Sequence, residues 1–509
     1  MSLEQNLLEV QNGQRVSRRD IPNLSLDEFR RTVLRVAANG GFVVQFFAYQ
    51  AEDGALKLLA VLRAGLGLFV TGCTVTEEYP ALTAESEKFH MFEREIAEQY
   101  GIRPKGHPWL KMVRYHANRR GTPDVFGNDY HEEIPGKYPY FTVEGETIHE
   151  VAVGPVHAGI IEPGHFRFQC IGELVLHLEI QLGYQHRGVE RLLEQPGQAL
   201  SRLPVICESI AGDTAVGHSL CHSQAIEALA GLEVSPAARI IRSVALELER
   251  LANHTGDLGA LSGDVAFNPP MAYFGRIRGE FLNLLLTLAG NRFGKGLVRP
   301  GGIAFPVLAE QREILRSKVV SETPGIEQVC DLLFTAHTVR ARFEQTGTVP
   351  RSMAEKMGLV GYAGRASGLP YDARVTFPTE AYAEVVANKN RRTSGDVYSR
   401  ANVRREEIRH SLQAIRHLLA RDLDAAPVMV PVRPQLAADS LVVTVNEAWR
   451  GEVSHCLLTG ADGAILRYKV KDPSFHNWTG LAMALRNQGI SNFPLCNKSF
   501  NLSYCGFDL

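Results

Sequence analysis

The chain has 509 residues, of which 45% are hydrophobic and 22% charged, and a formal net charge of −2. This length exceeds what one ordinary core supports, so we expect two or more domains. The nearly neutral charge argues against nucleic-acid binding, which usually needs a basic face. No apolar run reaches the roughly 18 residues that cross a bilayer. The first residues, Met1 to Gln5, lack the basic and apolar regions of a signal peptide, which favours a cytoplasmic location.

The eight cysteines are scattered, and no pair has the Cys-x-x-Cys spacing. In a large chain with this pattern, single cysteines are most often small buried hydrophobic residues. A self-contained iron–sulfur or zinc site would usually show clustered thiolates. The sequence therefore predicts that this chain binds no metal through its own cysteines.

Residues 1–140 are predicted to form a small α+β domain with a linker. Short apolar runs at 42–47 and 58–62, separated by glycine-containing breaks, are typical of strands. Residues 89–102 have the pattern of an amphipathic helix that Gly101 ends, because glycine adopts positive φ at little cost. A Gly-His-Pro turn follows at 106–108. By themselves these two features also fit a solvated glutamate-rich helix and an ordinary turn.

Residues 115–140 are rich in Arg, Gly, Asp and Pro, which is typical of a linker laid over a surface or a partner, so we place a boundary near 140. The second domain, 150–509, is predicted to begin with strands. Residues from Leu174 to Leu182 alternate apolar and mostly polar, and we expect a small sheet beside a loop that carries His157 and His165.

Helices are predicted to dominate after that sheet. An apolar stripe at helical spacing over 241–252 predicts one helix, ended by 253–257, and 281–288 predicts another. The glycine-containing segments 298–302 and 364–368 indicate loops where backbone approaches a neighbour closely. Strands return at 441–445 and 464–470. The predicted fold class is α+β: a small mixed N-terminal domain, then a mainly helical domain with peripheral strands.

The organising stretch runs from Gly154 to Ala230. It contains Gly-Pro-Val-His-Ala-Gly from 154, Gly-Tyr-Gln-His-Arg-Gly-Val-Glu-Arg-Leu from 183, and Cys-Glu-Ser-Ile-Ala-Gly-Asp-Thr-Ala-Val-Gly-His from 207. This stretch resembles the large subunit of group 4, formate-hydrogenlyase-type membrane-bound [NiFe] hydrogenases and the 49-kDa subunit of complex I. The helix and Gly-His-Pro turn resemble the 30-kDa subunit of complex I, fused ahead of it. The resemblance covers most of the chain and is densest at 87–110, 154–260, 298–302, 361–400 and 447–509.

The resemblance locates four metal-ligand positions. In the hydrogenases, a Cys-Gly-Ile-Cys quartet precedes a Phe-Ala-His that matches 216–218, and a second cysteine pair lies near the C-terminus. Here the four positions carry Ala211, Thr214, Ser503 and Gly506, none of which supplies a thiolate. Cys505 lies one residue from the last position. We therefore expect no metal in this chain, and a true [NiFe] hydrogenase is the least favoured alternative.

The resemblance also implies a quinone site of the complex I kind as an alternative. There the family uses a histidine of the first hairpin and a tyrosine in the loop that matches 211–214. The tyrosine position falls on Gly212 in this sequence, and His157 and His165 are the candidate hairpin histidines. These histidines act either as proton donors or only as backbone-satisfied hairpin residues.

What remains is a polar cavity, a candidate site for the transfer of protons. Asp213 is expected to pair with Arg187 or another cation in the space that the metal vacates. Paired carboxylates of this kind either relay protons or a conformational signal, or only neutralise one another, and both possibilities stay open. The candidate residues are His157, His165, His186, Arg187, Glu208, Asp213, His218 and Asp472.

The resemblance implies a peripheral subunit on the cytoplasmic side of the inner membrane. Expected partners are a small subunit that holds a [4Fe-4S] cluster, a ferredoxin-like subunit and the subunits of an ion-translocating membrane arm. The chain would couple electron transfer in the partner to that arm. The competing possibility is a catalytic subunit, similar to NADH dehydrogenase, that reduces quinone or another acceptor. Binding of NAD and quinone is implied only by the family.

Overall fold

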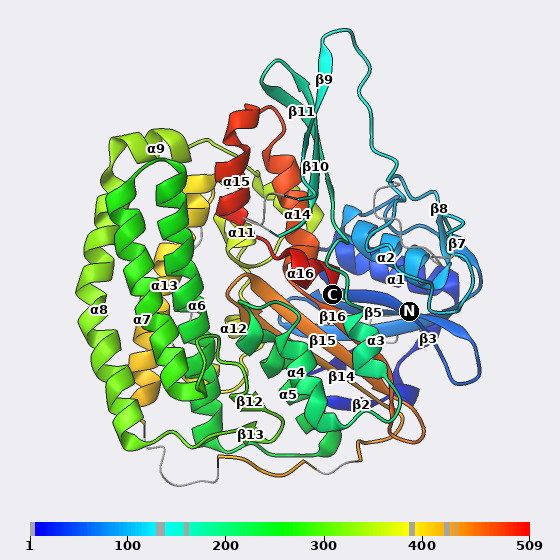
Figure 1. The fold of residues 1–509 in the computed structure, drawn as a ribbon. Coiled ribbons are helices and arrows are strands. Elements are labelled where there is room, and N and C mark those ends of the chain that lie inside the picture. The colour runs from blue at the N-terminus through cyan, green and yellow to red at the C-terminus, as the bar shows by residue number, and fades with distance from the viewer. Residues whose placement is uncertain (1–5, 129–137, 157–161, 386–391, 422–427, 433–434) are drawn as a thin grey trace.

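The computed structural model describes all residues except 1–5, 129–137, 157–161, 386–391, 422–427 and 433–434. Figure 1 shows long helices gathered on one side, a sheet of N-terminal strands on the other, and a C-terminal sheet between them. A three-stranded sheet projects above the rest of the molecule, beside the last helices of the chain. The predicted α+β class is confirmed.

The N-terminal sheet contains both predicted strands. Its antiparallel centre is β4 (Phe42–Gln50), β5 (Leu56–Ala64) and β6 (Gly67–Val75). Strands β1 (Leu8–Val10) and β3 (Asn23–Leu24) both pair with β6, and helix α1 (Leu26–Ala38) begins with a Ser25–Glu28 capping box. Strand β2 (Arg15–Ser17) instead pairs with the C-terminal sheet, so the first residues of the chain tie the two regions together.

Helix α2 (His90–Tyr100) forms where predicted and ends at Gly101, whose φ is 66°. The solvated alternative is wrong, because every residue of α2 is buried, Glu93, Glu95 and Glu98 included. Each of these carboxylates has a partner: Glu93 accepts from the Leu82 and Thr83 backbone N–H groups, and Glu95 pairs with Lys469 at 2.7 Å. The short strands β7 (Glu78–Pro80) and β8 (Arg103–Lys105) flank the helix as a parallel pair.

The projecting sheet consists of β9 (Ile148–Val153), β10 (His165–Ile171) and β11 (Leu174–Gln181), which confirms the small sheet expected there. The expected position of one histidine is corrected. His165 is the first residue of β10 rather than a loop residue, because its backbone pairs with Gln181. His157 lies outside the described residues.

The helical side is built from α6 (Pro236–Asp264), α7 (Asn268–Ala289), α8 (Ala309–Thr335) and α13 (Val397–Leu419). The predicted end of α6 at 253–257 is wrong. The polar side chains of that segment are buried and paired with α13: His254 lies 2.8 Å from Glu407, and Asp257 accepts from Arg404 at 2.9 Å. Because their polar groups have partners inside the bundle, the helix continues.

The two glycine-containing segments differ. Residues 298–303 form a hairpin of β12 (Val298–Arg299) and β13 (Gly302–Ile303), where a Cβ on Gly302 would lie 2.0 Å from the Val428 carbonyl oxygen. This close approach was predicted. Residues 364–366, in contrast, belong to helix α11 (Gly361–Ala366), so a loop there is wrong. The Arg365 side chain stabilises that helix by pairing with Glu407 and Glu447.

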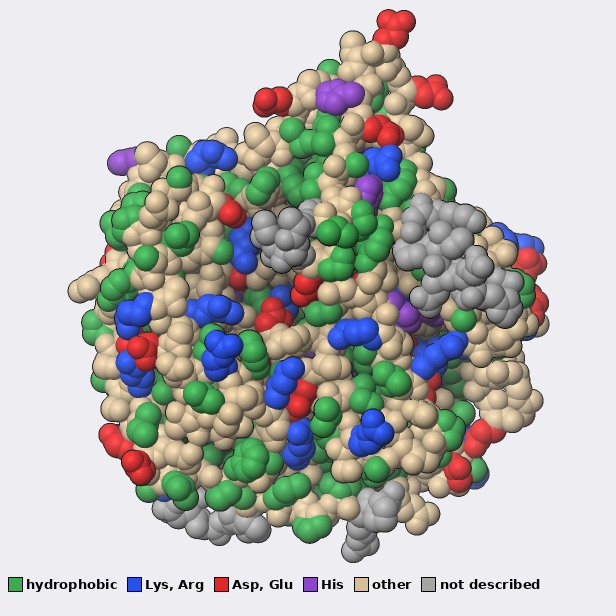
Figure 2. Space-filling model, viewed as in Figure 1, with side chains coloured by type: hydrophobic (Ala, Val, Ile, Leu, Met, Phe, Trp, Pro, Cys, Tyr) green, Lys and Arg blue, Asp and Glu red, His purple; other side chains and the backbone are tan. Residues whose placement is uncertain are grey.

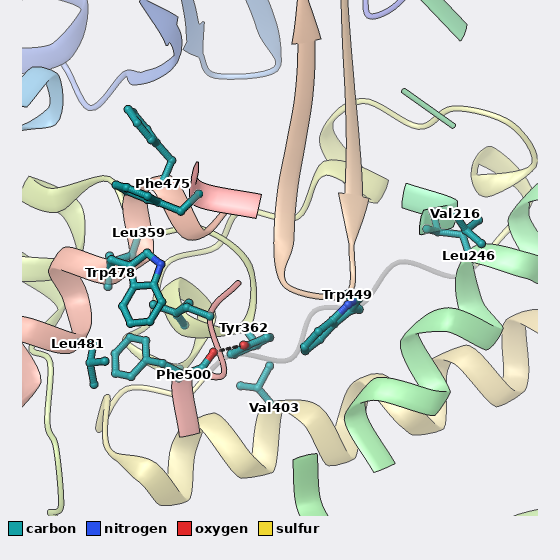
Figure 3. Close-up of a cluster of buried hydrophobic side chains, with 14 of the residues drawn as sticks. Val216, Leu246, Leu359, Tyr362, Val403, Trp449, Phe475, Trp478, Leu481 and Phe500 are labelled. Atoms are coloured by element: carbon teal, nitrogen blue, oxygen red, sulfur yellow. Dashed lines mark hydrogen bonds between the residues drawn. The ribbon is translucent and has the colours of Figure 1, made fainter. Parts of the chain in front are cut away.

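The C-terminal sheet is β14 (Ser440–Ala448), β15 (Gly451–Thr459) and β16 (Ile465–Lys471), with β2 at its edge. Trp449, in the β14–β15 turn, belongs to a buried apolar cluster with Tyr362 and residues of the last helices, drawn in Figure 3. The other helices of the described chain are α3 (Val189–Glu194), α4 (Leu203–Glu208), α5 (Ala215–Ala230), α9 (His337–Phe343), α10 (Arg351–Met357), α12 (Ala373–Thr376), α14 (Ser474–Ala484), α15 (Phe493–Phe500) and α16 (Tyr504–Asp508).

Candidate functional site

Two segments far apart in the sequence meet at the front of the C-terminal sheet. One is the 209–214 loop between α4 and α5, and the other is the tail around α16. Arg187 bonds to both, because its Nη2 donates to the Ile210 carbonyl at 2.9 Å and to the Cys505 carbonyl at 3.0 Å. The four positions compared with metal ligands therefore lie on adjacent segments.

Arg450 joins the same two segments from behind. It follows Trp449 in the β14–β15 turn, and its two terminal nitrogens donate to the Asp213 carboxylate at 2.6 and 2.7 Å. Its Nε donates to the Asn501 carbonyl at 2.7 Å. Burial lowers the pKa of Arg450, but Asp213 raises it more, so the guanidinium stays charged. The expected cation partner of Asp213 is thus Arg450 and not Arg187.

The four ligand positions have no room or donors for a thiolate-held metal. Ala211 is fully buried, and Thr214 Oγ1 already accepts from Arg450 and from the Trp449 indole at 3.1 Å. Ser503 Oγ accepts from the Gly506 N–H at 2.8 Å, which caps α16. A Cβ on Gly506 would lie 2.8 Å from the Asp472 carboxyl group.

The nearest thiols do not change this. Burial raises the pKa of Cys505 to about 11 and that of Cys207 further, so both are protonated at neutral pH. Within the described ranges there is no cluster of three or more histidine, cysteine or acidic residues that would hold a metal. The residues present do not fit a nickel–iron centre.

A chain of buried hydrogen bonds leads away from this place. Nε2 of His218 lies 3.1 Å from Asp472, and its Nδ1 lies 3.1 Å from His455 Nε2. Nδ1 of His455 is 2.8 Å from the Tyr468 hydroxyl, which in turn is 2.9 Å from His222 Nδ1. All five side chains are fully buried. His218 and His222 lie one turn apart on helix α5, so this single helix carries the first and the last of the three histidines in the chain.

The charge state of this relay, Asp472–His218–His455–Tyr468–His222, follows from burial. Burial lowers the pKa of His222 to about 3 and that of His455 well below its usual value. Burial also raises the pKa of Asp472, but the hydrogen bond and charge of His218 and the charge of Arg450 lower it more. His222 and His455 are therefore neutral rings and Asp472, at the other end of the relay, is a carboxylate, which suits transfer of a proton along hydrogen bonds.

Glu249 adds a second carboxyl group beside Asp213. Thr214, the residue before α5, makes no side-chain cap, and Glu249 instead accepts from the N–H groups of Val216 at 2.7 Å and Gly217 at 3.2 Å. Burial, with a smaller contribution from the charge of Asp213, raises the pKa of Glu249 to about 8 in spite of those backbone bonds, which lower it. This carboxyl group can accept or release a proton near neutral pH.

The other predicted residues are held apart from this site by local bonds. Glu208 pairs with Arg299 at 2.7 Å. His186 lies 2.7 Å from the Asp508 carbonyl, and burial lowers its pKa to about 4. His165 Nδ1 lies 3.2 Å from the Gly154 carbonyl. Among the predicted residues that the structure describes, Arg187, Asp213, His218 and Asp472 converge.

Sequence reasoning missed Arg450, Glu249, His455, Tyr468 and His222. The spacing of His218 and His222 was a visible signal, since both face one side of a helix. His455 and Tyr468 lie on neighbouring strands, and only the pairing of β15 with β16 brings them together. The sequence held no signal for that pairing register.

Comparison with known proteins gives one family match and several relatives. Residues 264–440 match the family described as the 49 Kd subunit of respiratory-chain NADH dehydrogenase. The chain is 27% identical to Hydrogenase-4 component G of Escherichia coli, over 92% of this chain and 80% of that protein. It is 26% identical to the membrane-bound hydrogenase subunit alpha of Pyrococcus furiosus, over 69% and 85%. It is 28% identical to NADH-quinone oxidoreductase subunit 4 of Thermus thermophilus, over 66% and 88%.

These matches confirm the resemblance inferred from the motifs. The family match itself covers α7, α8 and α13 and ends before Arg450 and Asp472, so it does not describe the site. In the described part of the chain, none of the helices has the length and apolar character that crossing a membrane requires.

Proposed function

Because its relatives are hydrogenase and NADH-quinone oxidoreductase subunits, we propose that this chain is a peripheral large subunit of a membrane-bound, hydrogenase-related assembly. It couples electron transfer in a small subunit that holds a [4Fe-4S] cluster to an ion-translocating membrane arm, from the cytoplasmic side. A ferredoxin-like subunit completes the electron path. Within the chain, residues 1–140 and 150–509 act as the 30-kDa-like and 49-kDa-like units.

The observation that supports a function without nickel is the set of bonds that Arg450 makes to the 209–214 loop and to the tail. A metal centre would be held between the 209–214 loop and the tail, and in this chain one guanidinium bonds to both. A charged arginine in a buried setting stays paired, so it cannot leave without exposing Asp213 as an uncompensated charge. Arg450 thus supplies the link between the two segments that ligand bonds would otherwise supply.

The role proposed for the emptied site is proton transfer or its electrostatic equivalent. Asp213 is partly exposed, with 36% of its side chain accessible, whereas the relay behind Arg450 is fully buried. A change of charge at the partner's cluster would change the electrostatic potential first at Asp213 and Glu249, and then at Asp472. In response, the hydrogen-bonded side chains of the relay, on α5 and the C-terminal sheet, would transfer a proton into the protein.

The surface beside the site suits a partner. Exposed apolar side chains lie on the segments around Arg187: Leu192 on α3, Val205 on α4, and Phe293 after α7. The Gly296 N–H donates to Glu208, which places the 291–299 segment against α4. Figure 2 shows Lys and Arg side chains spread across the middle of the same face. Such a mixture of apolar and basic groups is typical of a surface that a protein partner covers.

The test is metal analysis of the assembly purified in mild detergent, with counts assigned per copy of this chain. We expect no stoichiometric nickel, and iron only in the amount that the partner's clusters require. One nickel per chain, or hydrogen uptake that depends on this chain, would overturn the proposal. A monodisperse lone monomer would contradict the assembly. Quinone reduction that Asp213→Asn abolishes would favour the catalytic alternative instead.

A further inference from the structure

A second cavity, away from the candidate site, lies where the N-terminal region meets α14. Its volume is about 540 Å³, within the range of about 300–1,000 Å³ typical of small-molecule pockets. Its walls come from the start of α2, the Gly-His-Pro turn, the segment after residue 140, β11 and α14. Neither the motifs nor the proposed function assigns anything to it.

The walls are mostly apolar. The Trp109 indole lies on one side, stacked at 6.2 Å and 11° on the His90 ring, and Phe141 lies on another, 5.1 Å from the His177 ring. Burial lowers the pKa of His90 to about 3, so this ring adds no charge. Further apolar contacts come from residues that include Leu176, Leu178, Met357 and Met483. A cavity of this size and lining is suited to a flexible hydrocarbon body.

Helix α14 is built to leave this space open. Phe475, Trp478 and Leu481 point into the protein core, as Figure 3 shows. Thr479 and Ala482, one and two helical turns after Phe475, line the cavity, and their small side chains leave it unfilled. A smaller cavity of about 40 Å³ shares Trp109, Thr479 and Ala482 with the first and extends to Phe507. The apolar space is therefore elongated, and its inner end lies beside α16.

Two polar groups of the lining lack partners. Nε2 of His177 is buried and has no hydrogen bond to any described residue. Arg486, one turn after Ala482, is exposed, and no described residue forms an ion pair or side-chain hydrogen bond with it. Glu87 also lines the cavity, but Lys356 lies 3.9 Å from its carboxylate. The uncompensated charge at this cavity is the cation of Arg486.

We propose that this cavity binds a single-chain amphipathic carboxylate, a long-chain fatty acid anion. The hydrocarbon tail lies against Trp109 and Phe141 and points inward past Ala482. The carboxylate pairs with Arg486 and accepts a hydrogen bond from His177 Nε2, which satisfies the buried ring nitrogen. A neutral apolar ligand would leave His177 Nε2 and Arg486 without a partner. A purely polar anion would leave the apolar walls exposed to water.

The proposal is tested with 11-(dansylamino)undecanoic acid, whose emission rises in an apolar site, added to the purified full-length chain or its assembly. We expect saturable binding that oleate displaces. Ala482→Trp fills the cavity and should weaken binding at least tenfold. Arg486→Glu should weaken displacement by oleate about tenfold while leaving displacement by oleyl alcohol within twofold. Arg19→Glu, a distant exposed control, should bind as the wild type does.

Several results would overturn the proposal. These are no saturable binding, or equal binding in the wild type, Ala482→Trp and Arg486→Glu. If oleate and lysophosphatidic acid displace the probe equally, the class is wider than carboxylates and the fatty-acid assignment is wrong. Should Ala482→Trp fail to fold, judged by its melting curve, Thr479→Leu replaces it, and Arg486→Glu still decides because its side chain is exposed. None of these outcomes depends on whether the chain holds nickel.

Discussion

Arg450, in the β14–β15 turn, and Asp213, in the loop before α5, form a two-point ion pair with N–O distances of 2.6 and 2.7 Å, although they lie 237 residues apart in sequence. The planar guanidinium matches the carboxylate, which lysine could not do. The same side chain also bonds to the Asn501 carbonyl. The pair therefore holds together the two segments that carry Ala211, Thr214, Ser503 and Gly506.

Removing the cation should loosen this junction. Arg450→Met leaves Asp213 without its partner and the Asn501 carbonyl without its donor. Because Asp213 is 36% exposed, water offsets part of the loss, and we expect a drop in unfolding free energy of about 1–3 kcal/mol. Urea unfolding of both proteins measures it.

The matched control for that variant is Arg19→Met. Arg19 pairs with Asp439 at 3.4 Å but is 84% exposed, so its loss should cost no more than about 1 kcal/mol. The double variant Arg450→Met/Asp213→Asn should be more stable than the two single losses added together. Full additivity would mean that the pair does not couple the loop to the tail.

The tail position next to Asp472 should not tolerate a side chain. In Gly506→Ala the new Cβ would lie 2.8 Å from both the Asp472 carboxyl group and Ser503 Oγ, which are held by His218 and by the α16 cap. We expect a loss of about 1–3 kcal/mol in unfolding free energy. Gly212→Ala is the control, because a Cβ there meets nothing within 4 Å. Equal stability of the two variants would show that the tail moves to accommodate the added Cβ at little cost in free energy.

How far the sequence predicts this molecule depends on whether the signal is local. Strands β4 and β5 and the end of α2 at Gly101 follow from alternation and glycine conformation, and all were predicted. The extent of α6 was not, because His254 and Asp257 read as helix-ending polar residues until their partners on α13 are known. Partners of buried charges come from tertiary packing, which local pattern does not contain.

The site shows the same contrast between residues that local sequence signals predict and residues that only tertiary packing brings together. Asp213, His218 and Asp472 were predicted from motif positions, and they do converge. Glu208 and His186 were predicted as candidates of the same cavity, yet each bonds to a different neighbour, Arg299 and Asp508. Arg450, the residue that joins the site, belongs to a turn whose position depends on the register of β14 and β15.

Cutting the relay at its hydroxyl should be measurable in stability and in transport. Tyr468→Phe keeps the ring but leaves His455 Nδ1 and His222 Nδ1 without the bonds of 2.8 and 2.9 Å, at a cost of about 1–3 kcal/mol. Under the proposed function, ion transport by the assembly falls, while reduction of the partner's cluster does not. Tyr115→Phe is the control, since the buried Tyr115 hydroxyl has no partner among the described residues. Transport unaffected by Tyr468→Phe would remove the relay from the coupling path.

The last prediction concerns pH. The pKa of Glu249 is raised from 4.5 to about 8, so the folded protein binds this proton more tightly than the unfolded chain does. Stability from this group is therefore present below pH 4.5 and is lost as pH rises toward 8, by about 1.4 kcal/mol per pH unit. Glu249→Gln keeps an acceptor for Val216 and Gly217 but cannot titrate.

We expect the stability of the wild type relative to Glu249→Gln to fall steadily between pH 5 and pH 8. Urea unfolding of both proteins at each pH measures this difference. Glu98 and Asp508, whose pKa values burial raises to about 7, change stability in the same direction. Because both proteins contain them, that background cancels in the difference. A difference that stays constant with pH would mean that Glu249 is already ionised beside Asp213, and the site would then have one proton-accepting carboxyl group fewer.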